Sequence, residues 1–268
     1  MTYCVALNLQ DGLVFASDSR TSAGIDYMTS YSKMHMFNPS NDRLFVLLSA
    51  GNLATTQEVL NRLKRDIDFS DSVESLLTPR YMFEAADYIA RVTHDAQQSH
   101  LKSLQQAGVN GEVSWILGGQ IMGQPHSLMM IYPQGNYIEA SEATPYLQIG
   151  ETKYGKPVLD RVLDYKTSLE DAAKIALVSL TSTANSNITV GAPFELSTYK
   201  SDDYQLLRRC KFEANGDYLV QLEQTWKEGL SQVFNNLPGF EREDPEQETG
   251  LNDKAKSPGI NLQVQSLP

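Results

Sequence analysis

The start of the chain brings a hydroxyl and a potential free amine onto one residue. Thr2 follows Met1 directly, so removal of Met1 leaves a threonine that carries both a hydroxyl nucleophile and the α-amine of the chain. An α-amine has a reference pKa of about 7.7–8.0, so near neutral pH a substantial fraction of it can accept the hydroxyl proton. Such a nucleophile needs no histidine. It does need a cation that keeps the pKa of the amine low and a carboxylate that orients this cation.

A hairpin is expected to return Asp18 to the neighbourhood of Thr2. Residues 2–9 alternate between two sets of side chains, as a strand does, and residues 13–17 form a second expected strand. The turn between them contains Asp11-Gly12, which is one of the stronger local signals for a hairpin. Asp18 follows the second strand directly, so it is the candidate for the orienting carboxylate.

Lys33 is the candidate cation. It lies within residues 30–37, which are expected to form a third strand, and a lysine that faces inward from a strand is costly unless it is paired. We therefore expect Lys33 to face inward beside Asp18. Each residue also has an ordinary interpretation when it is taken alone: Thr2 as a strand residue, Asp18 as a strand end and Lys33 as a solvated side chain.

Other catalytic chemistries have little support. The four histidines are scattered, and the sequence contains no H-E-x-x-H, C-x-x-C, EF-hand, G-x-S-x-G or phosphate-binding loop motif. A glycine pattern at residues 118–123 lies between two expected strands instead of opening a helix, so it does not indicate a dinucleotide site. We expect neither a metal ion nor an organic cofactor.

The chain is acidic, and its 268 residues carry a formal net charge of −11 at pH 7. This charge argues against a general nucleic-acid binder, because phosphate neutralisation needs a basic surface. No stretch approaches the ~18 consecutive apolar residues of a membrane span, and no targeting signal is recognisable. Cys4 and Cys210 are too few for a disulfide framework, so we expect a cytoplasmic protein whose thiols are reduced.

The order of the expected elements indicates an α+β fold. Strands joined by turns, not by helices, form antiparallel sheets, and the helices then gather on their outer faces. Two such sheets packed face to face give a four-layer helix–sheet–sheet–helix sandwich. The expected strands are residues 2–9, 13–17, 30–37, 43–49, 113–121, 127–132, 137–139, 146–149, 194–199 and 206–212.

Helical periodicity accounts for most of the remaining sequence. Thr78-Pro79 is expected to cap and open a long helix that runs to about Gly108, and Ser168 with Asp171 has the spacing of a capping box at the start of another helix. The expected helices are a segment that contains residues 59–67, and then residues 79–108, 153–165, 169–183 and 217–234.

The composition changes after residue 235. The last part of the chain carries few large apolar residues and contains the acidic run Glu241–Glu248, which is most simply a solvated tail. We interpret residues 1–235 as a single domain and residues 236–268 as a C-terminal extension that is mobile or docked on a neighbouring subunit.

Taken together, the motifs resemble those of proteasome-type β-subunits, a family of N-terminal-nucleophile hydrolases with a threonine at the processed terminus. Their order is Thr2, then SDSRTS with Asp18, SYSKMHMF with Lys33, and VLLSAG with Gly51. The likeness extends over roughly residues 2–235 and includes the segment QIGETKYGKPVLDR. Within this family, the Met-Thr start, the segment SNITVGAPFEL and the C-terminal extension are similar to the Anbu group, bacterial proteasome homologues named as an ancestral β-subunit type.

The resemblance implies an αββα sandwich and a threonine peptidase mechanism. Thr2 would act as the nucleophile and, through its amine, as the general base. Lys33 would lower the pKa of this amine and help to activate the hydroxyl, and Asp18 would pair with Lys33. Gly51 would supply a backbone N–H to the oxyanion hole, where each donor is worth about 10²–10³ in rate. Ser49 would line the pocket for the residue that precedes the scissile bond.

The resemblance also implies a peptide or protein substrate, no cofactor, and self-assembly into a ring-like or open-ring homo-oligomer. The sequence does not indicate whether an ATP-driven unfolding partner exists. Two alternatives share the same fold. One is an N-terminal-nucleophile amidohydrolase that acts on a small or non-protein amide, and the other is an assembly subunit whose site is weak or vestigial.

The sequence departs from the family pattern at two places. Where the family has Gly-Ser-Gly, this chain has Gly150-Glu151-Thr152. A carboxylate at Glu151 that hydrogen-bonds to the terminal ammonium would raise the pKa of the amine and make it a poorer base, although Glu151 is equally explained as an acid at a helix start. The usual Asp-x-x-Ser support of the amine appears here as Ser186 and Thr189, which also suit a turn near a helix end.

Overall fold

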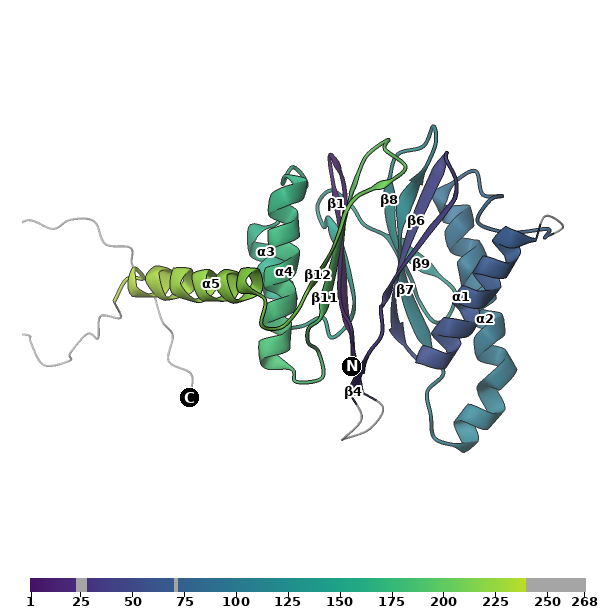
Figure 1. Cartoon of the computed structure of the whole chain (residues 1–268), viewed down its shortest axis with the longest axis horizontal. Helices are drawn as coiled ribbons and strands as arrows, with labels where there is room; N and C mark the ends of the chain where they lie inside the picture. Colours follow the sequence, from purple (N-terminus) through teal and green to yellow (C-terminus); the bar gives the residue numbers. More distant parts are fainter. Residues whose placement is uncertain (23–27, 70–71, 240–268) are drawn as a thin grey trace, which may run out of the picture. The chain divides into compact units, whose positions relative to one another are not determined.

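The computed structural model describes residues 1–22, 28–69 and 72–239 (Figure 1). The chain divides into two compact units, the first ending at Glu228 and the second beginning at Gly229. The first unit contains all the described strands. In the second unit the described residues are helical to Asn235. The predicted acidic run Glu241–Glu248 lies outside the described residues, and the predicted domain boundary stays a prediction.

Two antiparallel sheets of five strands each form the centre of the first unit. The first sheet contains β1 (Tyr3–Leu9), β2 (Gly12–Asp18), β10 (Tyr146–Gly150), β11 (Phe194–Lys200) and β12 (Leu206–Phe212). Their order in the sheet is β10-β1-β2-β11-β12. The second sheet contains, in order, β5 (Met34–Ser40), β6 (Arg43–Gly51), β7 (Val113–Ile121), β8 (Ser127–Ile131) and β9 (Tyr137–Glu139). A separate ribbon pairs β3 (Arg20–Ser22) with β4 (Met28–Ser30).

Helices cover the outer faces of both sheets (Figure 1). The second sheet carries α1 (Leu53–Asp68) and α2 (Met82–Gln106), and the first sheet carries α3 (Lys156–Val162) and α4 (Leu169–Ser186). A further helix, α5 (Asp217–Asn235), follows β12. The predicted α+β fold, a four-layer αββα sandwich, is therefore confirmed.

Both faces of the central strands are buried, and β1 shows how its sequence achieves this. Tyr3, Val5 and Leu7 pack toward the helices of the first sheet, whereas Cys4 and Ala6 face the second sheet across the centre of the sandwich. The alternation along a strand therefore divides one apolar segment between two cores. The start of β1 is held firmly from both sides as a result.

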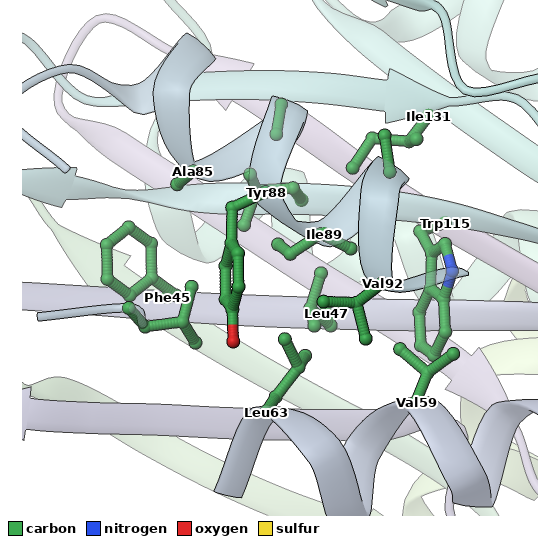
Figure 2. Packing of buried hydrophobic residues seen from close by; sticks show 14 of the residues in the cluster. Phe45, Leu47, Val59, Leu63, Ala85, Tyr88, Ile89, Val92, Trp115 and Ile131 are labelled. Carbon is green, nitrogen blue, oxygen red and sulfur yellow. The ribbon is translucent and has the colours of Figure 1, made fainter. Parts of the chain in front are cut away.

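A large apolar cluster fixes the second sheet to its helices (Figure 2). Fully burying one large apolar side chain contributes about 1.5–3 kcal/mol to stability. The polar atoms of the aromatic residues are also satisfied, because the Trp115 indole N–H donates to Thr93 Oγ1 at 3.0 Å and the Tyr88 hydroxyl donates to Asp66 at 2.7 Å. This packing holds β6 against α1 and so fixes the position of Gly51, where β6 ends.

Local hydrogen bonds explain where the helix boundaries differ from the sequence prediction. The long helix begins at Met82, so the predicted start at Thr78-Pro79 is wrong. The Thr78 hydroxyl instead closes a turn by donating to the Ser75 carbonyl at 2.9 Å, and the Glu84 carboxylate accepts from the Arg80 N–H at 2.7 Å near the helix start.

Other boundaries differ as well. The capping box at α4 is confirmed, since the Asp171 N–H donates to Ser168 Oγ at 3.1 Å. The helix predicted over residues 153–165 is shorter, because only Lys156–Val162 is α-helical. The strand predicted over residues 30–37 begins at Met34, and the ribbon of β3 and β4 was not predicted. Within the described ranges, no helix has the length and apolar character that a membrane span requires.

Candidate active site

Thr2 lies immediately before β1, an inner strand of the first sheet, and is half-buried. Its carbonyl accepts a hydrogen bond from the Glu151 N–H at 2.7 Å. Gly150 makes this close approach feasible, because its φ is +86° and a Cβ built there would lie 2.0 Å from the Thr2 carbonyl oxygen. Only glycine accepts this conformation and this contact without strain. The end of β10 therefore clamps the backbone of Thr2.

Asp18 and Lys33 form a buried ion pair beside this residue. Lys33 Nζ lies 2.6 Å from Asp18 Oδ1, and the two side chains are 8% and 0% exposed. The same carboxylate oxygen accepts from the Tyr3 N–H at 3.0 Å, and Lys33 Nζ also donates to the Arg20 carbonyl at 2.8 Å. The prediction that Lys33 faces inward beside Asp18 is confirmed, although Lys33 directly precedes β5 instead of lying within a strand.

The ion pair joins the two sheets at one end of the sandwich. Asp18 is the last residue of β2 in the first sheet, and Lys33 leads into β5 of the second sheet. The Lys33 carbonyl accepts from the Ser49 N–H of β6 at 3.0 Å, and the neighbouring Ser32 hydroxyl donates to Glu195 at 2.6 Å. The position of the ammonium group is therefore fixed from both sheets.

Burial and three nearby charges shift the pKa of the Met1 amine. Burial lowers the pKa of this amine, and the Lys33 ammonium acts in the same direction. The carboxylates of Asp18 and Glu151 raise the pKa. Burial also raises the pKa of Asp18, whereas Lys33 lowers it. An amine at this end of the chain is thus held between a cation that favours its neutral form and two carboxylates that favour its charged form.

Glu151 belongs to a polar chain that begins at the end of α4. Asn187 Nδ2 donates to Glu151 Oε2 at 2.8 Å, and the Thr189 hydroxyl donates to Asn187 Oδ1 at 2.6 Å. Glu151 is buried, and Ser186 is the exposed last residue of α4. The structure therefore brings Glu151 and Thr189 together through Asn187, and Ser186 lies outside this chain of hydrogen bonds.

Gly51 and Ser49 lie at the end of β6. Gly51 is exposed and has a φ of +129°, and a Cβ there would lie 2.2 Å from the Glu112 carbonyl oxygen. It directly precedes Asn52, whose side chain accepts from the Thr55 N–H at 3.1 Å and caps α1. Ser49 is buried, with Oγ 3.4 Å from His35 Nε2. The oxyanion-hole and pocket roles of these two residues stay predictions.

Two residues at this end of the sandwich, Arg20 and His35, were not predicted from the sequence. Arg20, in the unpredicted β3, holds Lys33 through its carbonyl, and its guanidinium donates to the Ile188 carbonyl at 2.8 Å. His35 lies two residues after Lys33. Strand alternation, which puts residues two apart on the same face, was the signal that could have found it. Within the described residues, no cluster of three or more His, Cys, Asp or Glu side chains could hold a metal ion.

We expect His35 to make the protein less stable as the pH falls. Burial lowers the pKa of His35 from its ordinary value of 6.5 to about 4, with Lys64 and Arg209 acting in the same direction. Between these two values the unfolded chain binds the proton and the folded chain does not, so the free energy of unfolding rises with pH. The contribution is complete above pH 6.5 and is lost toward pH 4.

Urea denaturation at several pH values checks this expectation. The loss of unfolding free energy between pH 6.5 and pH 4 should be smaller in His35→Gln than in the wild type. His94→Gln, at an exposed position, is the matched control. Equal acid sensitivity in the wild type and His35→Gln would show that His35 does not carry the effect.

The αββα sandwich, with a threonine, a buried Asp–Lys pair and a glycine at the end of β6, defines a proteasome-type subunit. The family model described as proteasome subunit matches residues 2–198. The chain therefore belongs to the proteasome subunit family. Membership of this family supports a hydrolase of the N-terminal-nucleophile type.

Solved structures of Anbu proteins are similar to this chain over nearly its whole length. Anbu (ancestral beta-subunit) from Yersinia bercovieri is 40% identical with a TM-score of 0.83, and the match covers 91% of this chain and 100% of that chain. The helical assembly of the Anbu complex from Pseudomonas aeruginosa is 41% identical with a TM-score of 0.83, and the match covers 92% of this chain and 100% of that chain. Anbu from Hyphomicrobium sp. strain MC1 is 40% identical with a TM-score of 0.79, and the match covers 90% of this chain and 100% of that chain. Comparison with curated proteins finds no significant match.

Proposed function

We propose that the chain is a threonine peptidase of the proteasome type that hydrolyses peptide bonds through Thr2 after removal of Met1. The observation that carries this proposal is the buried pair of Lys33 and Asp18, 2.6 Å apart, which lies beside the first strand. The Tyr3 N–H donates to the same Asp18 oxygen, so the residue after Thr2 is tied directly to the pair. This arrangement supports the proposal that Lys33 provides a cation next to the hydroxyl and amine of Thr2.

The proposed reaction proceeds in two balanced halves. Thr2 Oγ attacks the carbonyl carbon while its proton passes to the Thr2 amine, and the Gly51 N–H stabilises the oxyanion. The C–N bond then breaks, the leaving amine takes the proton, and an ester remains on Thr2. Water attacks this ester and gives a proton to the amine, which returns it to Oγ as the acid product leaves. Lys33 favours the neutral amine at both attacks.

Peptide hydrolysis and covalent labelling test this proposal together. The processed protein should cleave short fluorogenic peptides and should react with a β-lactone or a peptide boronate. A protein that does neither after removal of Met1 is not such a peptidase. If labelling occurs without peptide cleavage, a screen of small amides against casein and tripeptide controls identifies the amidohydrolase alternative. If neither label nor amide reacts, the chain is an assembly subunit with a vestigial site.

Glu151→Gln is expected to shift the rising limb of the pH–rate profile to lower pH. Glu151 raises the pKa of the Met1 amine, and its carboxylate acts in the same direction on an amine that belongs to Thr2. Catalysis needs the neutral amine, so the rate rises as the pH passes this pKa. Removal of the negative charge lowers the pKa, and the neutral form then appears at lower pH.

Measurement of kcat/KM across about pH 5–9 checks this expectation. Glu142→Gln, at an exposed position, is the matched control and should leave the limb in place. Asn187→Ala should displace the limb less than Glu151→Gln, because it frees Glu151 without removing its charge. A limb that stays in place in Glu151→Gln would exclude Glu151 from the environment of the amine.

The proposal includes self-association into a ring-like or open-ring homo-oligomer. The support is family membership together with the Pseudomonas aeruginosa relative, which is described as a helical assembly. Sedimentation velocity of the full chain tests this part separately from catalysis. A protein that stays monomeric over the accessible concentrations does not self-associate as proposed.

A further inference from the structure

Glu195 is a buried carboxylate that the proposed reaction does not use. It is the second residue of β11 and is only 8% exposed. Its neighbours Phe194 and Leu196 pack toward the helices of the first sheet, so Glu195 points to the opposite face, toward the second sheet. A carboxylate buried in an apolar layer is costly unless it is paired or hydrogen-bonded. Glu195 therefore needs partners at this position.

Two side chains of the described part of the chain contact this carboxylate. Ser32 Oγ donates a hydrogen bond to Glu195 Oε2 at 2.6 Å. Arg209 lies 3.9 Å from the other oxygen, Oε1, and its side chain is about half exposed, so this long ion pair contributes little. The Ser32 contact is therefore the stronger of the two. Because Ser32 leads into β5 of the second sheet, this contact joins the two sheets.

The contact between Ser32 and Glu195 lies beside the ion pair of the candidate site. Asp18 and Glu195 belong to adjacent strands, and Asp18 is paired with Phe194, the residue before Glu195. Their partners, Lys33 and Ser32, are consecutive in the chain. Two carboxylates of the first sheet thus hold two successive residues of the segment that leads into the second sheet.

Ser32 connects Glu195 to the backbone on both sides of Lys33. After Lys33 the chain is fixed by strand pairing, because Met34 is paired with Leu48 of β6. Ser32 lies outside the strands, and its hydroxyl also accepts from the Met34 N–H at 3.3 Å and lies 3.0 Å from the Met34 carbonyl oxygen. Loss of the Glu195 contact would free Ser32 and let Lys33 Nζ move relative to the start of β1.

We propose that Glu195 is a positioning residue that acts through Ser32 to hold the Lys33 ammonium group beside Thr2. This inference rests on the proposed function and deepens it, because the amine of Thr2 is the group on which Lys33 acts. Glu195 itself touches neither the substrate nor the reacting atoms. The hydrogen bond carries the effect and the negative charge does not, so an uncharged side chain of the same shape should replace Glu195.

Peptide hydrolysis measured across a range of pH tests this role. Ser32→Ala and Glu195→Ala should each lower kcat about ten-fold with little change in KM, because a small misplacement of a catalytic group is costly. The rising limb of kcat/KM should move to higher pH, since a more distant ammonium group favours the neutral amine less. Glu195→Gln keeps an oxygen that accepts from Ser32, so it should retain most of the activity and the position of the limb.

A double variant and a matched control make this test specific. Ser32→Ala combined with Glu195→Ala should lose no more activity than either single variant, because both changes remove the same contact. Ser40→Ala is the control: Ser40 is the last residue of β5, and its hydroxyl donates to Asp42. It should leave both kcat and the limb in place. Urea denaturation of each variant shows that it is folded under the assay conditions.

A second readout does not need peptidase activity. The pKa of the α-amine at the start of the chain can be measured from the pH dependence of its acetylation by trace acetic anhydride. This pKa should rise in Ser32→Ala and stay unchanged in Ser40→Ala. A wild-type protein that hydrolyses no peptide would remove the proposed function, and the pKa of the amine would still show whether Ser32 and Glu195 position Lys33.

Several results would overturn the inference. One is an amine pKa in Ser32→Ala that equals that of the wild type. Another is a Glu195→Gln variant that behaves like Glu195→Ala, because the charge and not the hydrogen bond would then carry the effect. Additive losses in the double variant would show that Ser32 and Glu195 act separately. Equal losses in Ser40→Ala would show a general effect of changes in β5.

Discussion

Replacement of Thr2 by alanine is expected to abolish peptide hydrolysis, with a loss of kcat of about 10³-fold or more. The reason is that Thr2 supplies both the atom that attacks and, through its amine, the group that accepts the proton. The variant keeps the α-amine but has no hydroxyl to form the ester. Labelling by a β-lactone should disappear together with hydrolysis.

Thr2→Ser is the matched control for this experiment. Serine keeps the hydroxyl and the amine, so it should retain measurable hydrolysis and labelling. Circular dichroism should show that all three proteins fold, because the backbone contacts of Thr2, such as the hydrogen bond from the Glu151 N–H, do not need its side chain. Hydrolysis that is equal in the wild type and Thr2→Ala would place the nucleophile elsewhere.

Lys33→Met is the second variant with a large expected effect, because it removes the cation from a buried pair. It leaves the carboxylate of Asp18, which is 0% exposed, without its ammonium partner. Breaking a buried ion pair on one side costs about 3–5 kcal/mol of stability. We also expect loss of hydrolysis, because no cation then favours the neutral form of the Thr2 amine.

A double variant separates the structural effect from the catalytic one. Asp18→Asn combined with Lys33→Met removes both charges, so it should recover most of the lost unfolding free energy while hydrolysis stays absent. Lys211→Met breaks the exposed pair with Glu213, 3.0 Å apart, and should cost at most about 1 kcal/mol. Urea denaturation measures all four proteins. A double variant that hydrolyses peptides at the wild-type rate would exclude Lys33 from the mechanism.

The parts of the fold that depend on local patterns could be predicted from the sequence. The β1–β2 hairpin follows from alternation and an Asp-Gly turn, and the start of α4 follows from the spacing of Ser168 and Asp171. The start of α2 could not be predicted this way, since Thr78 has two local uses. It can cap a helix or close a turn, and the neighbouring Ser75 decides for the turn.

Apart from Thr2, which follows from the start of the chain, the candidate site could be derived from the residues alone only where a buried charge requires a partner. Lys33 near a strand has to find a carboxylate, which pointed to Asp18. The contact between Glu151 and Asn187 joins residues 36 positions apart, so no local sequence pattern predicts it. Sequence alignment with the family pattern led to Ser186 and Thr189, but the end of α4 places Asn187 between Thr189 and Glu151. Side-chain choice at such a point depends on where the helix ends.

Intact mass combined with mapping of a β-lactone adduct tests the central proposal most directly. In protein purified from its native source, we expect a mass that lacks Met1, a single adduct on Thr2, and peptide hydrolysis that stops as this adduct forms. Retention of Met1 in protein that still hydrolyses peptides, or an adduct on any residue other than Thr2, would contradict the assignment of Thr2 as nucleophile.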